Sequence, residues 1–425
     1  MSFLDELRWR RMLHDATEGA QEALAQGEQQ AYVGFDPTAA SLHVGHLLPV
    51  MGLVHFQRAG HRPIAVVGGG TGLIGDPSGK SKERNLLTRD EVAANAGAVR
   101  AQLESFLDFG GVSNSARMLD NVEWLGTQGL LDFLRDVGKH FSVNALLRKE
   151  SVRTRLEDEE RGISYTEFSY LLLQSYDFLR IFQDHGCRFQ FGGSDQWGNI
   201  TGGIDLIRRV NGEKAYGVVF PLIITASGVK FGKTEEGAVW LSPERTSPYR
   251  FYQYWLNTDD ADVGSYLRYF TLLSRERIEE LEVAVEERPQ EREAQRALAD
   301  DVTARVHGES EVERARTASR VLFGGEIQGL GASEIEEIFF DVPSSVVSKE
   351  ALSGEGTGLV ALLADAGVTS SRGEARRALE QGGIYLNNRR VEDPQANVTV
   401  SDAVEGRFLV IRKGKRRYHL LRVEE

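Results

Sequence analysis

Short apolar runs and longer periodic stretches follow one another along the first half of the chain. The runs at 32–38 (YVGFDPT), 62–70 (RPIAVVGGG) and 187–193 (CRFQFGG) predict strands, and the stretches at 88–107 and 163–182 predict helices. Strands that alternate with helices indicate an α/β domain, with a parallel sheet covered by helices on both faces. In such sheets ligands bind at the carboxyl ends of the strands, where the first and third runs both carry polar residues.

Helix-start signals refine this pattern at two places. Thr88 with Glu91 three residues later predicts a capping box. Ser41 is expected to cap a second helix, on which His43 and His46 are neighbours in the first two turns. Pro49 would then lie inside that helix, where it should remove a hydrogen bond to Gly45 and kink the helix at a cost of about 3 kcal/mol.

The second half of the chain has a different organisation. Strand signals largely vanish over 243–323, which reads as a helical domain that follows an α/β domain at 1–242. Residues 324–354 are rich in Gly and Ser and read as a linker with a short ordered piece at 335–340. A small α+β module is expected at 355–425.

Composition limits the class of protein. The chain has 425 residues, 41% of them hydrophobic and 27% charged, with no apolar run long enough to span a bilayer, so a cytoplasmic protein without membrane contact is expected. The only cysteine, Cys187, excludes an internal disulfide and a cysteine-based metal cluster, and is expected to be a small core residue. The net charge of −13 argues against nucleic-acid binding by the chain as a whole. Residues 407–422, however, hold seven basic residues and no acidic one, so local binding there stays open.

Four glycine-rich, histidine or lysine motifs carry candidate chemistry. HVGH (43–46) lacks the spacing of a zinc protease, and its imidazoles suit a phosphate at a helix start. The loop at 68–81 fails as a P-loop, because Ile74 stands where the first glycine is needed. KFGKT (230–234) offers two lysines as point charges for phosphate oxygens, and GGSDQWGN (192–199) offers polar side chains at a strand end. Each motif alone is compatible with an ordinary surface loop.

Taken together and in this order, the motifs resemble the bacterial tyrosyl-tRNA synthetases. HVGH stands where class I synthetases have HIGH, and KFGKT where they have KMSKS. The segments GLIGDPSGK, YLLLQSYDF and GGSDQWGN are similar to the corresponding segments of the family. The segment SRGEARRALEQGGIYLNNRRV resembles the alpha-L RNA-binding module. The resemblance covers the whole chain and implies a Rossmann-like catalytic domain, a helical domain and an alpha-L domain.

The resemblance implies a two-step reaction. The carboxylate of L-tyrosine attacks the α-phosphate of ATP, which gives tyrosyl-adenylate and pyrophosphate, and the tyrosyl group then passes to the 3′-terminal adenosine of tRNA(Tyr). The first step needs positioning and positive charge rather than a strong base, because the carboxylate is already ionised. The resemblance further implies Mg²⁺ with ATP, no metal ligands from the protein itself, and a homodimer.

It also assigns roles to residues of this chain. The groups expected to act on the phosphates are Thr38, His43, His46, Lys230, Lys233 and Thr234, with Lys80 and Arg84 over the pyrophosphate. Tyr32 and Asp177 flank the substrate phenol, Tyr170, Gln174 and Asp76 grip its ammonium group, and Gln196 lies near its carboxylate. Further contacts to ATP are expected from Gly34, Asp36, Gly45, Gly193 and Asp195, the last on the ribose. RNA contacts are expected from Arg372, Arg376, Arg377, Arg389, Arg390, Lys413, Lys415 and Arg416.

Some features depart from the family, and two alternatives stay open. Val33 cannot hydrogen-bond a ribose, and Phe231 and Gly232 replace the Met and Ser of the generic lysine signature. One alternative is another class I adenylate-forming enzyme, such as a tryptophanyl-tRNA synthetase or an HxGH nucleotidyltransferase. The other is an RNA-binding homologue that has lost catalysis.

Overall fold

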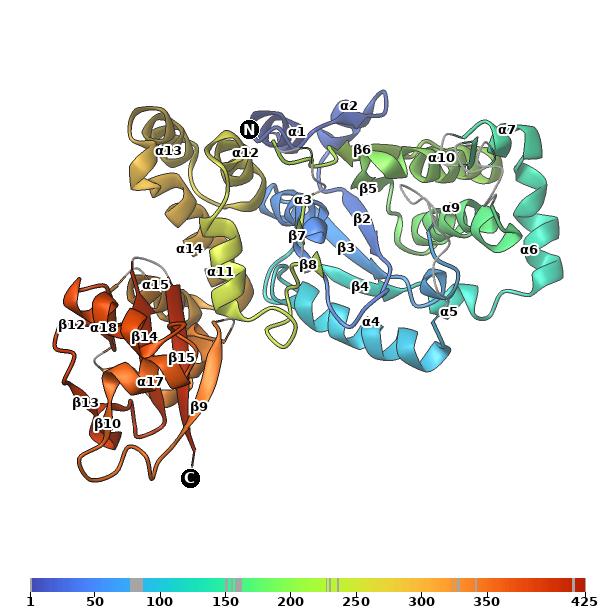
Figure 1. The fold of residues 1–425 in the computed structure, drawn as a ribbon. Helices are drawn as coiled ribbons and strands as arrows, with labels where there is room; N and C mark the ends of the chain where they lie inside the picture. Colours follow the sequence, from blue (N-terminus) through green and yellow to red (C-terminus); the bar gives the residue numbers. More distant parts are fainter. Residues whose placement is uncertain are drawn as a thin grey trace. The chain divides into compact units, whose positions relative to one another are not determined.

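In the computed structural model the chain forms two compact units, Met1–Val306 and His307–Glu425 (Figure 1). The described residues are 2–76, 87–149, 152–153, 156, 163–226, 228, 231–234, 237–322, 324–325, 327, 329–340, 342–414 and 417–424. For Lys233 and Thr234 the description covers the backbone alone.

A six-stranded sheet forms the centre of the first unit. Its spatial order is β1-β6-β5-β2-β3-β4, in which β1 pairs antiparallel with β6 and every other neighbouring pair is parallel. The strands are β1 (Asp15–Ala16), β2 (Gln30–Phe35), β3 (Arg62–Val67), β4 (Arg117–Asp120), β5 (Phe189–Gly193) and β6 (Tyr216–Phe220). The predicted parallel sheet is therefore confirmed.

Helices cover both faces of this sheet (Figure 1). On one face, Tyr32 and Ile64 pack in a buried cluster with Phe178 of α9 (Tyr165–His185) and Leu206 of α10 (Trp197–Asn211). On the other face, Phe191 of β5 lies 5.4 Å from Phe3 and 5.2 Å from Phe56, measured between ring centroids. These two rings belong to α1 (Phe3–Trp9) and α3 (Leu47–Arg58), and α4 (Arg89–Glu104) packs on β3. Burial of large apolar rings on both faces fixes the sheet between two helical layers. The free thiol Cys187 is buried in the first of these clusters, as the sequence predicted.

The capping signals had different outcomes. Thr88 and Glu91 form the predicted capping box of α4, and Ser164 and Glu167 form another at α9. The prediction for Ser41 is wrong, because its hydroxyl donates to the carbonyl of Leu42 and accepts from Gln102 instead. His43 caps a 3-10 turn over Val44–His46, and α3 begins only at Leu47.

The later helix start also corrects the expectation for Pro49. This residue is the third of α3, and the first N–H groups of a helix have no intrahelical acceptor. The α-helix thus starts where the missing N–H of proline removes no interior hydrogen bond, so the expected cost does not apply.

The first unit also contains α11 (Pro248–Leu256), α12 (Asp260–Phe270), α13 (Arg275–Glu287) and α14 (Glu293–His307), in whose last turn the unit ends. Shorter helices, α2 (Ala20–Leu24), α5 (Val122–Leu125), α6 (Leu130–Asp136) and α7 (Val143–Leu147), lie along the rest of it. No described helix is both long and apolar enough to cross a bilayer.

The second unit contains a five-stranded sheet of order β12-β11-β14-β15-β9. These strands are β9 (Ser344–Ser348), β11 (Ile384–Leu386), β12 (Arg389–Val391), β14 (Phe408–Lys413) and β15 (Arg417–Glu424); β10 (Thr357–Gly358) pairs with β13 (Asn397–Val398) apart from them. The helices are α15 (Glu309–Leu322), α16 (Ala332–Ile338), α17 (Leu359–Asp365) and α18 (Arg372–Glu380). This is the α+β character predicted for the end of the chain.

The division between the units does not coincide with the boundaries expected from the sequence. Helix α15, expected in a helical domain at 243–323, belongs to the second unit, where the carbonyl of Val321 accepts from Asn388 and from the hydroxyl of Tyr418. Strand β9 lies in the expected linker at 324–354, yet it pairs in parallel with β15. Both contacts are long-range in sequence, which a local composition pattern does not reveal.

Candidate active site

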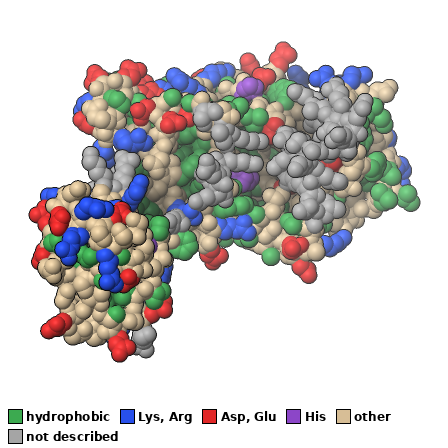
Figure 2. Space-filling model, in the orientation of Figure 1, with side chains coloured by type: hydrophobic (Ala, Val, Ile, Leu, Met, Phe, Trp, Pro, Cys, Tyr) green, Lys and Arg blue, Asp and Glu red, His purple; other side chains and the backbone are tan. Residues whose placement is uncertain are grey.

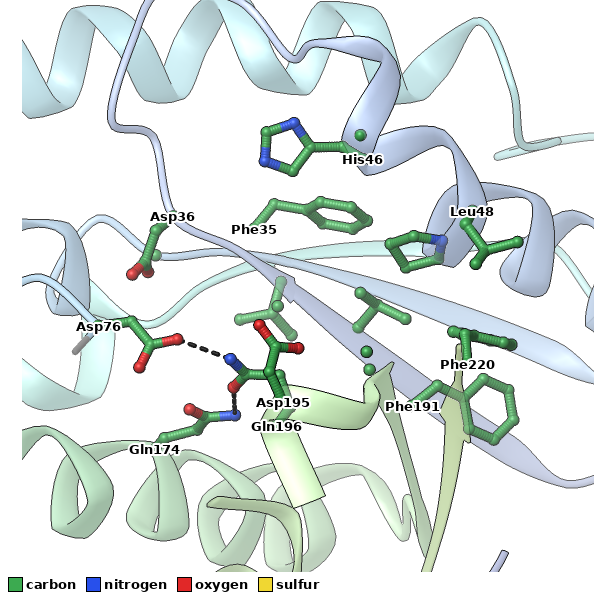
Figure 3. Close-up of a pocket in the computed structure, with 18 of the residues that line it drawn as sticks. Phe35, Asp36, His46, Leu48, Asp76, Gln174, Phe191, Asp195, Gln196 and Phe220 are labelled. Atoms are coloured by element: carbon green, nitrogen blue, oxygen red, sulfur yellow. Dashed lines mark hydrogen bonds between the residues drawn. The ribbon is translucent and has the colours of Figure 1, made fainter. Parts of the chain in front are cut away.

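A cavity of about 530 Å³ opens at the carboxyl ends of β2, β3, β5 and β6 (Figure 3). This is the edge at which parallel α/β sheets bind ligands. The predicted site residues that line it are Tyr32, Gly34, Asp36, Thr38, His43, Gly45, His46, Asp76, Tyr170, Gln174, Asp177, Gly193, Asp195 and Gln196. Residues far apart in the sequence thus meet in one chamber.

Several predicted residues stand apart from this set. Lys80, Arg84, Lys230, Lys415 and Arg416 lie outside the described residues, and Lys233 and Thr234 are placed by their backbone only. Val33, singled out as a departure from the family, also lines the cavity, and its side chain is apolar.

At the deep end of the cavity lies a buried carboxyl group, Asp177. One of its oxygens accepts from the indole of Trp124 at 2.7 Å, and the other accepts from the amide of Asn121 at 2.9 Å. Burial raises the pKa of Asp177 to about 8, against the lowering effect of these two donors. Close by in the same cavity, the hydroxyl of Tyr32 is buried and has no hydrogen-bond partner among the described residues.

A chain of hydrogen bonds connects this end to the rest of the chamber. Asn121 also donates to Thr71, Thr71 donates to Asp36 at 2.7 Å, and the hydroxyl of Tyr170 donates to the other oxygen of Asp36 at 2.8 Å. Burial raises the pKa of Tyr170 above its ordinary value, so this hydroxyl keeps its proton and remains a donor. The network fixes the orientation of each member, as fully paired buried polar groups do.

A second group of polar side chains surrounds Asp76. Gln196 donates to its carboxylate at 2.7 Å, and Gln174 donates to Gln196 at 3.3 Å (Figure 3). Asn199 in turn donates to both glutamines, at 2.8 Å and 3.0 Å. Tyr170, Gln174 and Asp177 all face the cavity from α9, as their spacing along a helix predicted.

The HVGH segment presents its two imidazoles to the other side of the chamber, where Figure 3 shows His46 above Phe35. The ring centroids of His43 and His46 are 4.0 Å apart. The Nδ1 atom of His43 accepts from the N–H of Gly45, and Nδ1 of His46 accepts from the N–H of His43, both at 3.1 Å. In each neutral ring this assigns the proton to Nε2, which makes Nε2 a hydrogen-bond donor.

HVGH and KFGKT, distant in sequence, pack against each other. Gly232 has a φ of +80°, and a β-carbon there would lie 2.8 Å from the side chain of Val44 and 3.3 Å from the N atom of Gly45. The strand segment that follows continues this contact, since Val44 donates to the carbonyl of Val239 and Leu241 donates to that of Leu42. Only glycine tolerates both this backbone conformation and this close approach. The histidine motif therefore has its partner in the lysine motif.

The glycine-rich loop after β3 does not cradle a phosphate with its first N–H groups. Gly69 donates to Asp120 and Gly70 donates to Asn121, at 3.1 Å and 2.7 Å. The rejection of a P-loop from the sequence agrees with these pairings.

Sequence reasoning missed several residues that shape the site, above all Asn121, Trp124, Thr71 and Asn199. Asn121 follows the carboxyl end of β4, so the rule that found the other strand ends could have found it. No sequence pattern marked Trp124, because its hydrogen bond to Asp177 joins segments that are 53 residues apart in the chain.

The predicted RNA-binding residues of the second unit differ in their pairing. Arg376 and Arg377 are exposed on α18, whereas Lys413 is bonded to Glu374 at 2.6 Å and Arg390 is paired with Glu392 at 3.1 Å. Arg372 lies 4.0 Å from Asp365, and Arg389 is exposed on β12. Figure 2 shows basic side chains on this unit with acidic ones between them.

Comparison with known proteins identifies the family. The sequence profile of the class I tRNA synthetases (W and Y) matches residues 24–324, and that of the tyrosine–tRNA ligase SYY-like C-terminal domain matches residues 334–421. The tyrosine–tRNA ligase of Roseiflexus castenholzii is 55% identical over 99% of both chains. That of Geobacillus stearothermophilus is 51% identical over 99% of this chain and all of its own.

Solved structures agree. A C-terminally truncated mitochondrial tyrosyl-tRNA synthetase from Aspergillus nidulans superposes with a TM-score of 0.69 and 29% identity, over 76% of this chain and 94% of its own. A tryptophanyl-tRNA synthetase from Encephalitozoon cuniculi shares the fold, with a TM-score of 0.52 over 73% of this chain and 87% of its own, at only 13% identity. The chain therefore belongs to the class I aminoacyl-tRNA synthetases and, among them, to the bacterial tyrosine–tRNA ligases.

Proposed function

We propose that the cavity holds L-tyrosine with its phenol at Asp177 and Tyr32, and ATP beside it under HVGH. The observation that carries this proposal is the placement of a buried, doubly hydrogen-bonded carboxyl group and an unpaired phenol in the same chamber as the histidine pair. A tyrosine–tRNA ligase activates tyrosine with ATP and transfers it to tRNA(Tyr), and both first-step substrates need such a chamber.

The deep end is suited to recognition of a phenol. A substrate hydroxyl placed there gives Tyr32 a partner and can donate to Asp177 when that group is ionised. Phenylalanine would leave these buried polar groups unpaired. Tyrosyl-tRNA synthetases are a known example of this rule, with a known discrimination of about 10⁵ without editing.

The opposite end of the amino-acid pocket is suited to an ammonium group. Asp76 supplies negative charge, and Gln174 and Tyr170 supply oxygens close to it. Gln196, bonded to Asp76, is placed to contact the carboxylate that becomes the nucleophile. This arrangement orients the carboxylate without the need for a base.

The phosphates of ATP are assigned to the side of the cavity that carries HVGH. There the Nε2–H donors of His43 and His46, the hydroxyl of Thr38 and the lysines of KFGKT would meet negative charge as it develops on the α-phosphate. Asp195 with Gly193 at the end of β5, and Gly34 with Asp36 at the end of β2, are assigned to the nucleotide.

Mg²⁺ is proposed to enter with ATP rather than at a protein-built site. The described residues contain no cluster of three or more His, Cys, Asp or Glu side chains arranged to hold a metal ion. Mg²⁺ commonly binds substrate phosphates with one or two carboxylates, and Asp36 is a carboxylate that lines this cavity. The ion would then neutralise phosphate charge, while the residues above position the reactants.

The second unit is proposed to bind tRNA(Tyr). Its match to the C-terminal domain of tyrosine–tRNA ligases and the exposed arginines of α18 support this assignment. ATP and tRNA are also substrates available in the cytoplasm, which we propose as the site of action.

A homodimer is supported by an apolar surface on the first unit. Leu130 and Leu131 of α6 have exposed fractions of 71% and 81%, and Val143 of α7 and Tyr165 of α9, further along the chain, are also exposed. Figure 2, drawn in the orientation of Figure 1, shows hydrophobic side chains at the edge of the first unit where α6 lies. Exposed apolar surface of this kind commonly marks a protein interface.

The decisive experiment is ATP–pyrophosphate exchange measured with tyrosine, tryptophan and phenylalanine in turn. Exchange with tyrosine alone is expected. Exchange with tryptophan only would favour the alternative class I activity, and no exchange at all would favour an inactive RNA-binding homologue.

A further inference from the structure

Helices α11 and α12 hold the KFGKT loop through the ring of Phe231. This ring is buried, stacks on Phe270 with a centroid distance of 5.1 Å, and meets Tyr266 edge-on at 5.0 Å. Aromatic pairs of this geometry add to the stabilisation from burial. The residue that replaces the methionine of the generic signature therefore fixes the loop to the helical region.

The next residue is held by a hydrogen bond. The N–H of Gly232 donates to the phenolic oxygen of Tyr254, on α11, at 3.2 Å. On its other side, Gly232 packs against Val44 and Gly45 of HVGH. The backbone between the two lysine positions is thus fixed from both sides.

A second hydrogen bond lies upstream in the chain. The N–H of Ala226 donates to both carboxylate oxygens of Asp262, on α12, at 3.2 Å and 3.0 Å. Ala226 precedes Lys230 in sequence and Gly232 follows it. The chain is therefore anchored on both sides of the first lysine, by side chains from two consecutive helices.

Neither Tyr254 nor Asp262 is among the residues that line the cavity, whereas Phe231 and Gly232 are. Both are hydrogen-bonded to the backbone of the loop, and this contact is the route by which they can affect the reaction. We propose that Tyr254 and Asp262 are positioning residues of the activation step, which hold the lysine segment against HVGH. This proposal rests on the proposed role of the KFGKT lysines at the phosphates.

The physical reason is the length of the lysine side chain. A flexible cation gives full stabilisation only if its backbone is already placed, and a misplacement of 1 Å can cost about a hundredfold in rate. Loss of one backbone hydrogen bond is expected to lower the equilibrium constant for the correctly placed loop about tenfold. We therefore expect an effect on the rate constant of activation and none on tyrosine binding.

The test uses the full-length enzyme and measures single-turnover formation of enzyme-bound tyrosyl-adenylate at saturating tyrosine and ATP, per active site. For Tyr254→Phe, which keeps the ring and removes the oxygen, the rate constant is expected to fall about tenfold. The dissociation constant for tyrosine should stay unchanged. The matched control is Tyr266→Phe, because the ring of Tyr266 also contacts Phe231 but its hydroxyl has no partner among the described residues.

Asp262 provides a rescue test. Asp262→Ala is expected to slow activation, and Asp262→Asn, which keeps an oxygen that can accept from Ala226, should recover most of the rate. A merely structural role would lower the unfolding midpoint and the fraction of active sites, with the rate per active site unchanged, and would overturn the proposal. Transfer from preformed adenylate to tRNA(Tyr) should not change, because pyrophosphate has already left.

Lys233→Ala separates this proposal from the function on which it rests. If Lys233→Ala activates tyrosine at the normal rate, the assignment of the lysines fails and the positioning proposal fails with it. If Lys233→Ala is slow while Tyr254→Phe and Asp262→Ala are normal per active site, the lysine assignment stands and the positioning proposal alone is overturned.

Discussion

Trp124 donates its indole N–H to Asp177 at 2.7 Å and so holds one oxygen of the carboxyl group that faces the proposed phenol site. The bond comes from the short helix α5, outside every motif that the sequence analysis singled out. Asn121 holds the other oxygen, so the carboxyl plane is fixed before any ligand enters. Recognition of the substrate hydroxyl then costs little reorganisation.

Removal of this donor should weaken selection for tyrosine. In Trp124→Phe an aromatic ring remains and the N–H is lost, so the KM for tyrosine in ATP–pyrophosphate exchange is expected to rise about tenfold, the value of one buried hydrogen bond. The kcat/KM for phenylalanine should change little, because phenylalanine has no hydroxyl to place. An equal loss for both amino acids would indicate general damage to the pocket and contradict the assigned role.

The raised pKa of Asp177 predicts an unusual dependence of stability on pH. Its pKa is shifted from 3.8 to about 8 by burial, so between these values the ligand-free native protein binds a proton that the unfolded chain has released. The free energy of unfolding should therefore decrease as pH rises through this window, by up to about 1.4 kcal/mol per pH unit from this group. Above about pH 8 its contribution should be constant.

The isosteric variant Asp177→Asn isolates this contribution. Urea unfolding of both proteins at pH 5, 6.5 and 8 gives two stability profiles. The native protein should lose stability relative to Asp177→Asn as pH rises, whatever the absolute cost of the substitution. Parallel profiles would show that the carboxyl group is ionised in the native state throughout.

Most of the chamber could be predicted because polar residues at strand ends follow from topology. Once β2 and β5 are recognised as parallel neighbours, Asp36 and Asp195 must lie at one edge of the sheet. The spacing of Tyr170, Gln174 and Asp177 was equally informative, because residues i, i+4 and i+7 of a helix lie on the same face.

The predictions fail where a contact with residues far away in the sequence determines the local structure. Ser41 is a good N-cap by type, but its oxygen accepts from the N–H of Ser242, so it belongs to the contact between HVGH and the strand segment after KFGKT. Helix α15 has the same hydrophobic periodicity as the helices before it. Its place in the second unit is evident only from the carbonyl of Val321, which accepts from Asn388 and Tyr418. Such pairings carry no local pattern.

The position of α15 leads to a prediction about truncation. A chain that ends after residue 354 retains β9 without its partner β15, and retains Val321 without Asn388 and Tyr418. A chain that ends after Val306 removes the second unit as a whole. Both should form tyrosyl-adenylate and charge tRNA(Tyr) poorly, but the first should aggregate more, because it exposes an unpaired strand edge. Light scattering on heating and a charging assay test both points, and loss of adenylate formation in the Val306 truncation would contradict the assignment of the second unit to tRNA.

The apolar surface on α6 leads to the last prediction. Leu131→Glu places a charge where a second copy of the chain would bury it, and burial of an unpaired charge costs several kcal/mol, so the dimer dissociation constant should rise at least about a hundredfold. Val283→Glu is the matched control, since Val283 is an exposed apolar residue of α13, with an exposed fraction of 50%, away from α6 in the sequence. Sedimentation equilibrium should show Leu131→Glu as a monomer at concentrations where the native protein and Val283→Glu remain dimers. Dimers of unchanged affinity in Leu131→Glu would place the interface elsewhere, and a native protein that is itself a monomer would reject the homodimer.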